Sequence, residues 1–269
     1  MLTKEKIIAR NNVNVIGSGP QTLMLAHGFG CDQTMWHYLT PELRSHYTLV
    51  MFDYVGSGQS QLSAFSRSRY GSLEGYTQDI NEICEALDLA DVHFVGHSIS
   101  CTIGLMASIA DPGRFASHIM VCPSPCFLND PPDYHGGFER ADLEELISLM
   151  DRNYIGWATY LAPLVMGTNS SEVLIGEMTE SLCSTDPLVA KIFAQATFFS
   201  DYRHLLPQAR HPSLLLQSKT DSLANEDVGK YMYAHMPQSN LRVLPTVGHC
   251  IHMTHPALVL GEIRAWMNP

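Results

Sequence analysis

The chain has 269 residues, 45% of them hydrophobic and 16% charged, with a formal net charge of −11. It is long enough to bury a substantial core in one large domain or two small ones, and its composition has no signature of disorder. The acidic surplus disfavours binding to nucleic acid or to anionic membranes, so we expect a small or neutral partner.

The sequence contains no segment typical of export or of membrane insertion. Residues 1–10 lack an apolar run of signal-peptide length, and no later apolar run is long enough to span a membrane. The seven cysteines are odd in number and form no Cys-x-x-Cys pair, which argues against a disulfide framework and against a zinc site. We therefore expect a cytoplasmic protein without a metal or another cofactor.

The first half of the chain alternates strand and helix patterns. Residues 7–15 alternate polar and apolar side chains, which predicts an edge strand or hairpin. Residues 22–26 and 47–52 are short apolar runs typical of strands buried on both faces of a parallel sheet. Residues 72–89 have the apolar spacing of an amphipathic helix, and a further strand is expected at 118–122. This order predicts a mostly parallel, doubly wound α/β sheet.

The pattern changes after residue 125. Residues 126–207 are mostly helical in pattern and contain no buried strand, so we expect a helical unit inserted between two parts of the core, at residues 1–125 and 208–269. Its scattered aromatic residues either pack this unit onto the sheet or line a cavity above it. The sheet then resumes, with two strands and a last helix at 213–217, 241–244 and 258–266.

Ser98 lies between a buried strand and a helix rich in small residues, in the segment Val95-Gly96-His97-Ser98-Ile99-Ser100. This is the context of a nucleophile elbow, a tight turn that holds the nucleophile in a strained conformation and needs small neighbours such as Gly96. The usual pattern is Gly-x-Ser-x-Gly, and here Ser100 replaces the last glycine. A motif this short is weak evidence until other residues support it.

Two further residues give that support. Asp221 directly follows one buried strand and His249 follows the next, so we expect both at the same sheet edge as Ser98. The chain order Ser, Asp, His is that of α/β-hydrolases. His249 would be the general base for the Ser98 hydroxyl, and Asp221 would hold the tautomer of His249. The oxyanion would be stabilised by the backbone N–H groups of Phe29 and Ile99.

Other interpretations of these segments are weaker. Gly56-x-Gly58 matches part of a dinucleotide loop, but the third glycine and the helix after it are missing. A metal site of His27, His97 and His249 has no carboxylate arranged with it. His97 either touches a cavity or packs structurally.

Several short segments match one group of hydrolases. Those in the core are Gly28-Phe29-Gly30-Cys31-Asp32-Gln33, residues 52–58 and Gly96-His97-Ser98. Others lie at the start of the insertion, within it, or around His249: residues 123–126, 128–130, 136–139, 153–159, 183–187, 199–201 and 248–250. The insertion varies widely among hydrolases. Through these segments the chain resembles the RsbQ-like α/β-hydrolases, bacterial regulators of the general stress sigma factor, and more distantly the plant strigolactone and karrikin receptors.

This resemblance implies an α/β-hydrolase fold whose core is capped by a four-helix lid, with a hydrophobic pocket between them. Carried over position by position, it places six residues in the substrate pocket: Phe29, His97, Phe127, Trp157, Leu161 and Phe198. Ser100 fits as well, because the plant receptors have serine there. Two residues depart from these relatives: His27 stands where the RsbQ-like proteins have proline, and Leu161 where the plant karrikin receptors have phenylalanine. Both departures bear on the size of the pocket and on its ligand.

The resemblance also implies slow hydrolysis linked to signalling, with a PAS-domain phosphatase as the protein partner. Our leading expectation is a serine hydrolase of a small hydrophobic ester or lactone that acts as an RsbQ-like regulator. One alternative is a general carboxylesterase of metabolism. Another is a butenolide or strigolactone-type receptor with weak hydrolase activity, in which the triad anchors the ligand and the lid signals by moving.

Overall fold

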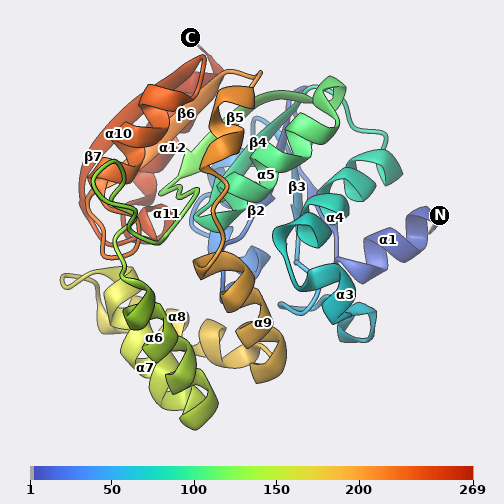
Figure 1. The fold of residues 1–269 in the computed structure, drawn as a ribbon. Coiled ribbons are helices and arrows are strands. Elements are labelled where there is room, and N and C mark those ends of the chain that lie inside the picture. The colour runs from blue at the N-terminus through green and yellow to red at the C-terminus, as the bar shows by residue number, and fades with distance from the viewer. Residues whose placement is uncertain (1–2, 269) are drawn as a thin grey trace.

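The computed structural model describes residues 3–268, which are built around one seven-stranded sheet (Figure 1). In chain order the strands are β1 (Asn14–Ile16), β2 (Thr22–Ala26), β3 (Thr48–Phe52), β4 (Val92–His97), β5 (Phe115–Val121), β6 (Ser213–Thr220) and β7 (Ser239–Val247). They lie side by side in the order β1-β3-β2-β4-β5-β6-β7, and every neighbouring pair is parallel except β1 and β3. The mostly parallel sheet predicted from the sequence is thus confirmed.

Helices cover both faces of this sheet. α4 (Leu73–Ala86), α5 (Ile99–Ala110) and α10 (Glu226–His235) lie on one face (Figure 1). α12 (Pro256–Met267) lies on the other, where the indole of its Trp266 donates to Ser117 of β5. Because helices cover both faces of the mostly parallel sheet, the sheet is doubly wound. The shorter helices are α1 (Lys4–Arg10), α2 (Thr40–Leu43), α3 (Arg67–Tyr70) and α11 (Ile251–Thr254).

Four helices, called the lid below, form the insertion between β5 and β6. They are α6 (Arg140–Arg152), α7 (Tyr154–Met166), α8 (Glu172–Ser184) and α9 (Pro187–Phe198), gathered at one end of the molecule in Figure 1. Three of them start at residues whose side chains accept hydrogen bonds from first-turn N–H groups: Asn153, Ser171 and Asp186. Within residues 3–268, no helix has the length and apolar character needed to cross a membrane.

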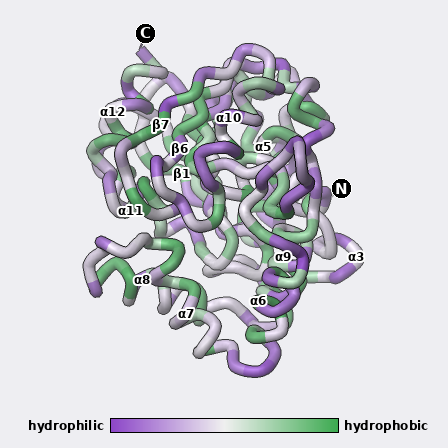
Figure 2. Tube along the Cα trace, turned by 60° about the vertical axis from the view of Figure 1, so that its left-hand side comes forward, coloured by the Kyte–Doolittle hydropathy of each residue, from purple (hydrophilic) through white to green (hydrophobic). Residues whose placement is uncertain are grey.

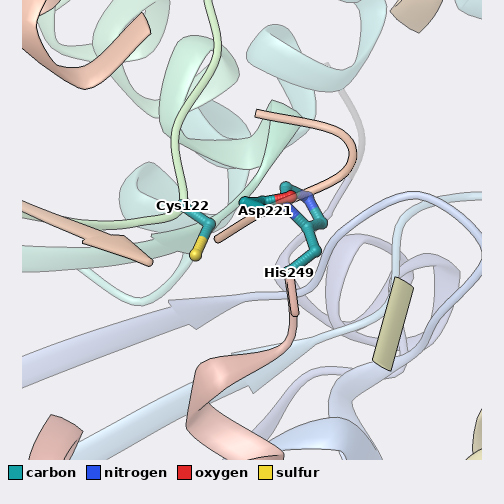
Figure 3. A group of neighbouring side chains, drawn as sticks. All are labelled: Cys122, Asp221 and His249. Carbon is teal, nitrogen blue, oxygen red and sulfur yellow. Dashed lines mark hydrogen bonds and ion pairs between the residues drawn. The ribbon is translucent and has the colours of Figure 1, made fainter. Parts of the chain in front are cut away.

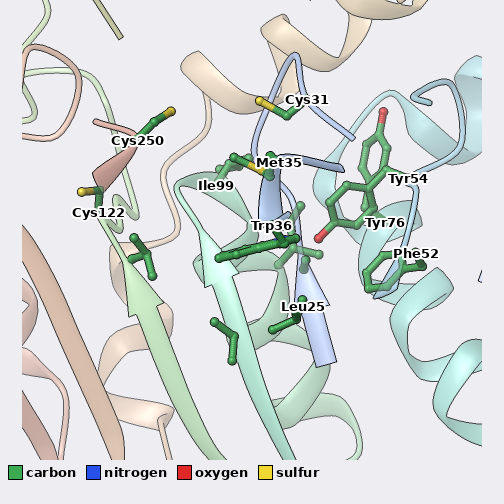
Figure 4. Packing of buried hydrophobic residues seen from close by; sticks show 14 of the residues in the cluster. Leu25, Cys31, Met35, Trp36, Phe52, Tyr54, Tyr76, Ile99, Cys122 and Cys250 are labelled. Atoms are coloured by element: carbon green, nitrogen blue, oxygen red, sulfur yellow. The ribbon is translucent and has the colours of Figure 1, made fainter. Parts of the chain in front are cut away.

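The core lies along the inner strands. Leu25, Phe52 and Ile99 are almost completely buried where β2, β3 and the start of α5 meet (Figure 4). Figure 2 shows hydrophobic residues concentrated along these inner segments and hydrophilic residues along the outer loops. Strands covered on both faces need apolar side chains on both, which is why their sequences are continuous apolar runs.

The N-terminal segment differs from the predicted edge strand or hairpin. Residues 4–10 form α1, and only Asn14–Ile16 form a strand. Arg10 at the end of α1 is buried, with its guanidinium 3.1 Å from Asp79 and 2.5 Å from Glu82 on α4. This helix is fixed by ion pairs with residues far away in the chain, which a local apolar pattern does not reveal.

Candidate active site

Ser98 lies at the turn between β4 and α5. Its backbone has φ 56° and ψ −125°, a region that residues other than glycine rarely adopt. Gly96 permits this turn, because a Cβ atom there would lie 2.9 Å from the backbone nitrogen of Cys101. The segment therefore has the geometry of a nucleophile elbow.

Three side chains from separate strand ends form a hydrogen-bonded chain. Ser98 Oγ lies 2.7 Å from His249 Nε2, and His249 Nδ1 lies 2.7 Å from Asp221 Oδ2. The other oxygen of Asp221 accepts hydrogen bonds from the N–H groups of Leu223 at 2.8 Å and Ala224 at 3.1 Å. Because the Asp221 carboxylate accepts from Nδ1–H, Nε2 is left to accept the proton of Ser98.

Cys122 stands beside this chain at the end of β5 (Figure 3). Its sulfur and donor atoms of Asp221 and His249 lie within 4.8 Å of one another, a set of atom types that zinc accepts. Asp221 and His249 are already joined by their hydrogen bond, so a metal ion would have to replace the proton between them. The arrangement suits proton transfer by His249 at least as well as metal binding.

Two buried imidazoles lie next to His249. The ring centroid of His97 is 4.8 Å from that of His249 and 4.5 Å from that of His252. His97 Nε2 lies 3.1 Å from the backbone oxygen of His249, so this nitrogen carries a proton and donates. Burial is the main cause that holds the pKa of His97 well below its ordinary value, and burial lowers the pKa of His252 to about 3. Both rings are therefore neutral at pH 7.

Because these buried imidazoles are neutral in the folded protein, we expect the free energy of unfolding to fall in acid. Burial also lowers the pKa of His118 to about 3. Between about pH 6.5 and pH 3, His118 and His252 bind protons in the unfolded chain but not in the folded one, so each lowers the free energy of unfolding by up to about 1.4 kcal/mol per pH unit. Urea unfolding at pH 7, 6 and 5 should show this loss.

His252→Phe isolates one of these groups. Both ring nitrogens of His252 lack a hydrogen-bond partner in the part of the chain that the structure describes, so phenylalanine breaks no such bond. The variant is expected to reduce the pH dependence by up to about 1.4 kcal/mol per pH unit. His46→Gln, at an exposed position, is the control and should leave the dependence unchanged. If His252→Phe keeps the wild-type slope, His252 is protonated in the folded chain and this explanation is wrong.

A cavity lies above Ser98 and His249, with walls from both the core and the lid. Its free volume is about 20 Å³, which is room for about one water molecule. Four of the six predicted pocket residues line it: Phe29, His97, Leu161 and Phe198. The remaining lining residues, which were not predicted from the sequence, are Cys31, Val165, Met178, Leu182, Thr197, Leu223 and Cys250.

Phe127 and Trp157, the other two predicted pocket residues, lie behind these walls. The ring of Phe127 packs against Phe198 with centroids 5.2 Å apart, and the ring of Trp157 packs against Phe29 at 6.1 Å. They support the lining rather than form it. Among the residues missed, Leu223 and Cys250 could have been found because they lie within two positions of Asp221 and His249.

A second and larger hollow adjoins the cavity. It has a volume of about 510 Å³ and lies between α6, α7 and the segment after β6, with Phe138, Leu146 and Leu164 among its lining residues. This larger hollow is called the outer groove below. Leu161 and Leu223 line both the cavity and the outer groove, so these two side chains separate the two spaces.

Backbone N–H groups contribute to the site in two ways. Among residues 3–268, the N–H groups of Phe29 and Ile99 donate to no other protein group, which leaves them available to a substrate oxygen. The N–H of His249 donates to the carbonyl of Val165 at 2.7 Å, near the end of α7 in the lid. His249 is therefore attached to both the core and the lid.

The sheet, the elbow and the strand-end Asp and His together define an α/β-hydrolase. The chain belongs to the alpha/beta hydrolase family, whose model matches residues 23–262. It is 39% identical over 251 residues to the Karrikin insensitive 2 receptor CA of Petunia hybrida, covering 93% of each chain. It is 34% identical over 254 residues to the Strigolactone esterase RMS3 of Pisum sativum, covering 94% of this chain and 95% of that protein.

A solved structure is more similar still. A hydrolase from Oleispira antarctica superimposes with a TM-score of 0.98 at 55% identity, over 100% of this chain and 98% of that one.

Proposed function

We propose that this protein is a serine hydrolase of small hydrophobic esters or lactones. The observation that carries the proposal is the hydrogen-bonded chain from Ser98 through His249 to Asp221, buried beneath an apolar cavity. A serine hydroxyl becomes a useful nucleophile when an imidazole of fixed tautomer can take its proton, and this geometry supplies both conditions.

The first half of the reaction forms an acyl-enzyme. Ser98 Oγ attacks the carbonyl carbon while His249 Nε2 takes the hydroxyl proton, and Asp221 stabilises the imidazolium that results. The carbonyl oxygen becomes an oxyanion that accepts hydrogen bonds from the N–H groups of Phe29 and Ile99. When the bond to the alkoxy oxygen breaks, that oxygen takes the proton from His249. A simple ester loses its alcohol at this point, whereas a lactone keeps it attached.

The second half of the reaction regenerates the protein. A water molecule gives a proton to His249 and attacks the acyl carbon, and the bond to Ser98 Oγ then breaks. Ser98 recovers its proton from His249, and the carboxylic acid leaves. In the first half the proton passes from Ser98 to His249, and in the second half it passes from His249 back to Ser98.

The walls of the site favour a small hydrophobic substrate. The cavity is lined mainly by Phe29, Leu161 and Phe198 with other apolar side chains. Its volume of about 20 Å³ means that even a short acyl group enters only when the walls move, and a longer one needs more movement. The outer groove beyond Leu161 and Leu223 can take the larger apolar part of a substrate. This division supports a short acyl group joined to a bulkier apolar group.

A panel of p-nitrophenyl esters tests this substrate class. Wild type is expected to prefer the acetate to the hexanoate. Leu161→Ala removes part of the wall toward the groove, so kcat/KM for hexanoate relative to acetate should rise roughly tenfold. Leu164→Ala, on the same helix but lining only the groove, is the control and should change that ratio by less than about twofold. An unchanged ratio in Leu161→Ala would show that Leu161 does not limit the acyl group.

We place this hydrolysis in a regulatory role of the RsbQ type, with a PAS-domain phosphatase as partner; the matching segments in the lid support this. A general carboxylesterase would instead turn over many short esters rapidly. A receptor for a butenolide-type ligand is the second candidate, and the observation that favours it is the 39% identity to a karrikin receptor. The two candidates differ in whether turnover at Ser98 is required.

A further inference from the structure

Ser100, which replaces the last glycine of the elbow, joins two parts of the site. It is completely buried in the first turn of α5. Its hydroxyl donates to the backbone carbonyl of His27 and accepts a hydrogen bond from the Tyr54 hydroxyl at 3.0 Å. His27 is the second residue before Phe29, whose N–H faces the substrate in the proposed reaction. A glycine at position 100 could make neither bond.

The ring of His27 makes a second connection. Its Nε2 accepts the backbone N–H of Tyr54 at 3.0 Å, so the proton of this neutral ring is on Nδ1, which donates to the carbonyl of Gly28 at 2.9 Å. Burial lowers the pKa of His27 by more than the nearby Asp53 carboxylate raises it, which keeps the ring neutral. Burial also raises the pKa of Tyr54 well above its ordinary value, so its hydroxyl remains a donor.

These bonds fix the direction of the Phe29 N–H. The carbonyl of Gly28 and the N–H of Phe29 belong to one planar, trans peptide group, so they point in opposite directions. Holding the Gly28 carbonyl therefore aims the Phe29 N–H, and holding the His27 carbonyl fixes the peptide group before it. On its other side Gly28 contacts His97, because a Cβ atom on Gly28 would lie 2.5 Å from His97 Nδ1. The loop has little freedom to turn.

Ser100, Tyr54 and the ring of His27 are together called the brace below. The aromatic rings around Tyr54 hold the brace in place. Tyr54 is completely buried, and its ring packs against His27 at 4.8 Å, Phe52 at 5.2 Å and Tyr76 at 5.4 Å between centroids. Figure 4 shows Phe52, Tyr54 and Tyr76 grouped on the same side of the strand ends. The brace is therefore rigid on the side away from the substrate.

The geometry points to Ser100, Tyr54 and His27 as positioning residues that align the Phe29 N–H with the oxyanion. The inference rests on the proposed function, in which that N–H stabilises the tetrahedral intermediate. Ser100 and Tyr54 touch no reacting atom and act through the loop of residues 27–29. Preorganised donors are effective only when aimed at the oxyanion before the reaction begins.

Steady-state kinetics on p-nitrophenyl acetate test the inference with Ser100→Ala and Tyr54→Phe. Each variant is expected to lower kcat by about tenfold to a hundredfold while KM changes by less than about threefold, because the donor is misaligned and not removed. Affinity for a boronic acid, which forms a tetrahedral adduct on Ser98, should fall by the same factor as kcat. The double variant should lose less than the product of the single losses, because both act through one brace.

Ser108→Ala is the matched control. Ser108 is also buried on α5, and its hydroxyl donates to Leu105 and contacts His118 rather than the loop. It should leave kcat and boronic acid affinity unchanged. If Ser100→Ala does the same, Ser100 is only structural and the inference is wrong. If Ser100→Ala does not fold, Tyr54→Phe decides alone, since it removes one hydroxyl and keeps the ring. Should Ser98→Ala itself retain full activity, the proposed function fails instead.

Discussion

Ser98→Ala is expected to reduce hydrolysis of p-nitrophenyl acetate by about 10⁴-fold or more, with little change in Tm. The hydroxyl of Ser98 is the only nucleophile within hydrogen-bond distance of His249 Nε2 in the described chain. Alanine tolerates the strained turn no worse than serine does, so the fold should survive. Hydrolysis rates and thermal melting of the two proteins measure both parts of this expectation.

Mass spectrometry of the intact protein adds a direct test. Wild type treated with a fluorophosphonate or a reactive butenolide should gain one adduct on Ser98, and Ser98→Ala should gain none. Ser108→Ala controls for the loss of a buried hydroxyl on the neighbouring helix. Full activity in Ser98→Ala would overturn the hydrolase proposal. If activity disappears but a ligand still raises the Tm of Ser98→Ala and the regulatory output persists, the receptor function is correct.

Asp221→Asn is expected to lower kcat by about 10³–10⁴-fold while the protein stays folded. The carbonyl oxygen of asparagine can still accept the N–H groups of Leu223 and Ala224. Its amide group would then face His249 Nδ1 and donate to it, which forces the ring proton onto Nε2. In that tautomer His249 cannot take the proton of Ser98.

The size of the loss in Asp221→Asn distinguishes two roles of Asp221: fixing the tautomer of His249, and only holding the loop of Leu223. Asp227→Asn, an exposed change at the start of α10, is the control and should have no effect on kcat. A loss of less than tenfold in Asp221→Asn, with the Tm unchanged, would mean that Asp221 only holds the loop of Leu223 and does not fix the tautomer. Stopped-flow measurement of the acylation step would then be expected to match wild type.

The sequence predicted the three strand-end residues because each lies within two residues of the end of its strand. Buried parallel strands are recognisable as apolar runs, and their carboxyl ends must meet at one edge, so Ser98, Asp221 and His249 could be placed together without any contact information. The same logic placed Phe29. A local sequence pattern was sufficient to place the residues that come soon after a predicted strand.

Elsewhere the pattern was insufficient. The helical spacing in α8 does not tell which face meets the core, so Met178 and Leu182 were not identified as part of the cavity wall. Trp157 was placed in the pocket and lies behind Phe29 instead. Ser100 appeared as a defect in a motif, because its partners Tyr54 and His27 come from other loops. Contacts between distant segments decide all four positions.

The hydrogen bond from the His249 backbone to Val165 has a kinetic consequence. The cavity is too small for a substrate as it stands, so some part of the lid must move to admit one. A shift at the end of α7 would release the N–H of His249 and disturb the general base. Substrate entry and catalysis would then require different positions of the end of α7. We therefore expect closure of the lid, rather than the chemical step, to limit turnover, which pre-steady-state kinetics would reveal as a burst-free progress curve.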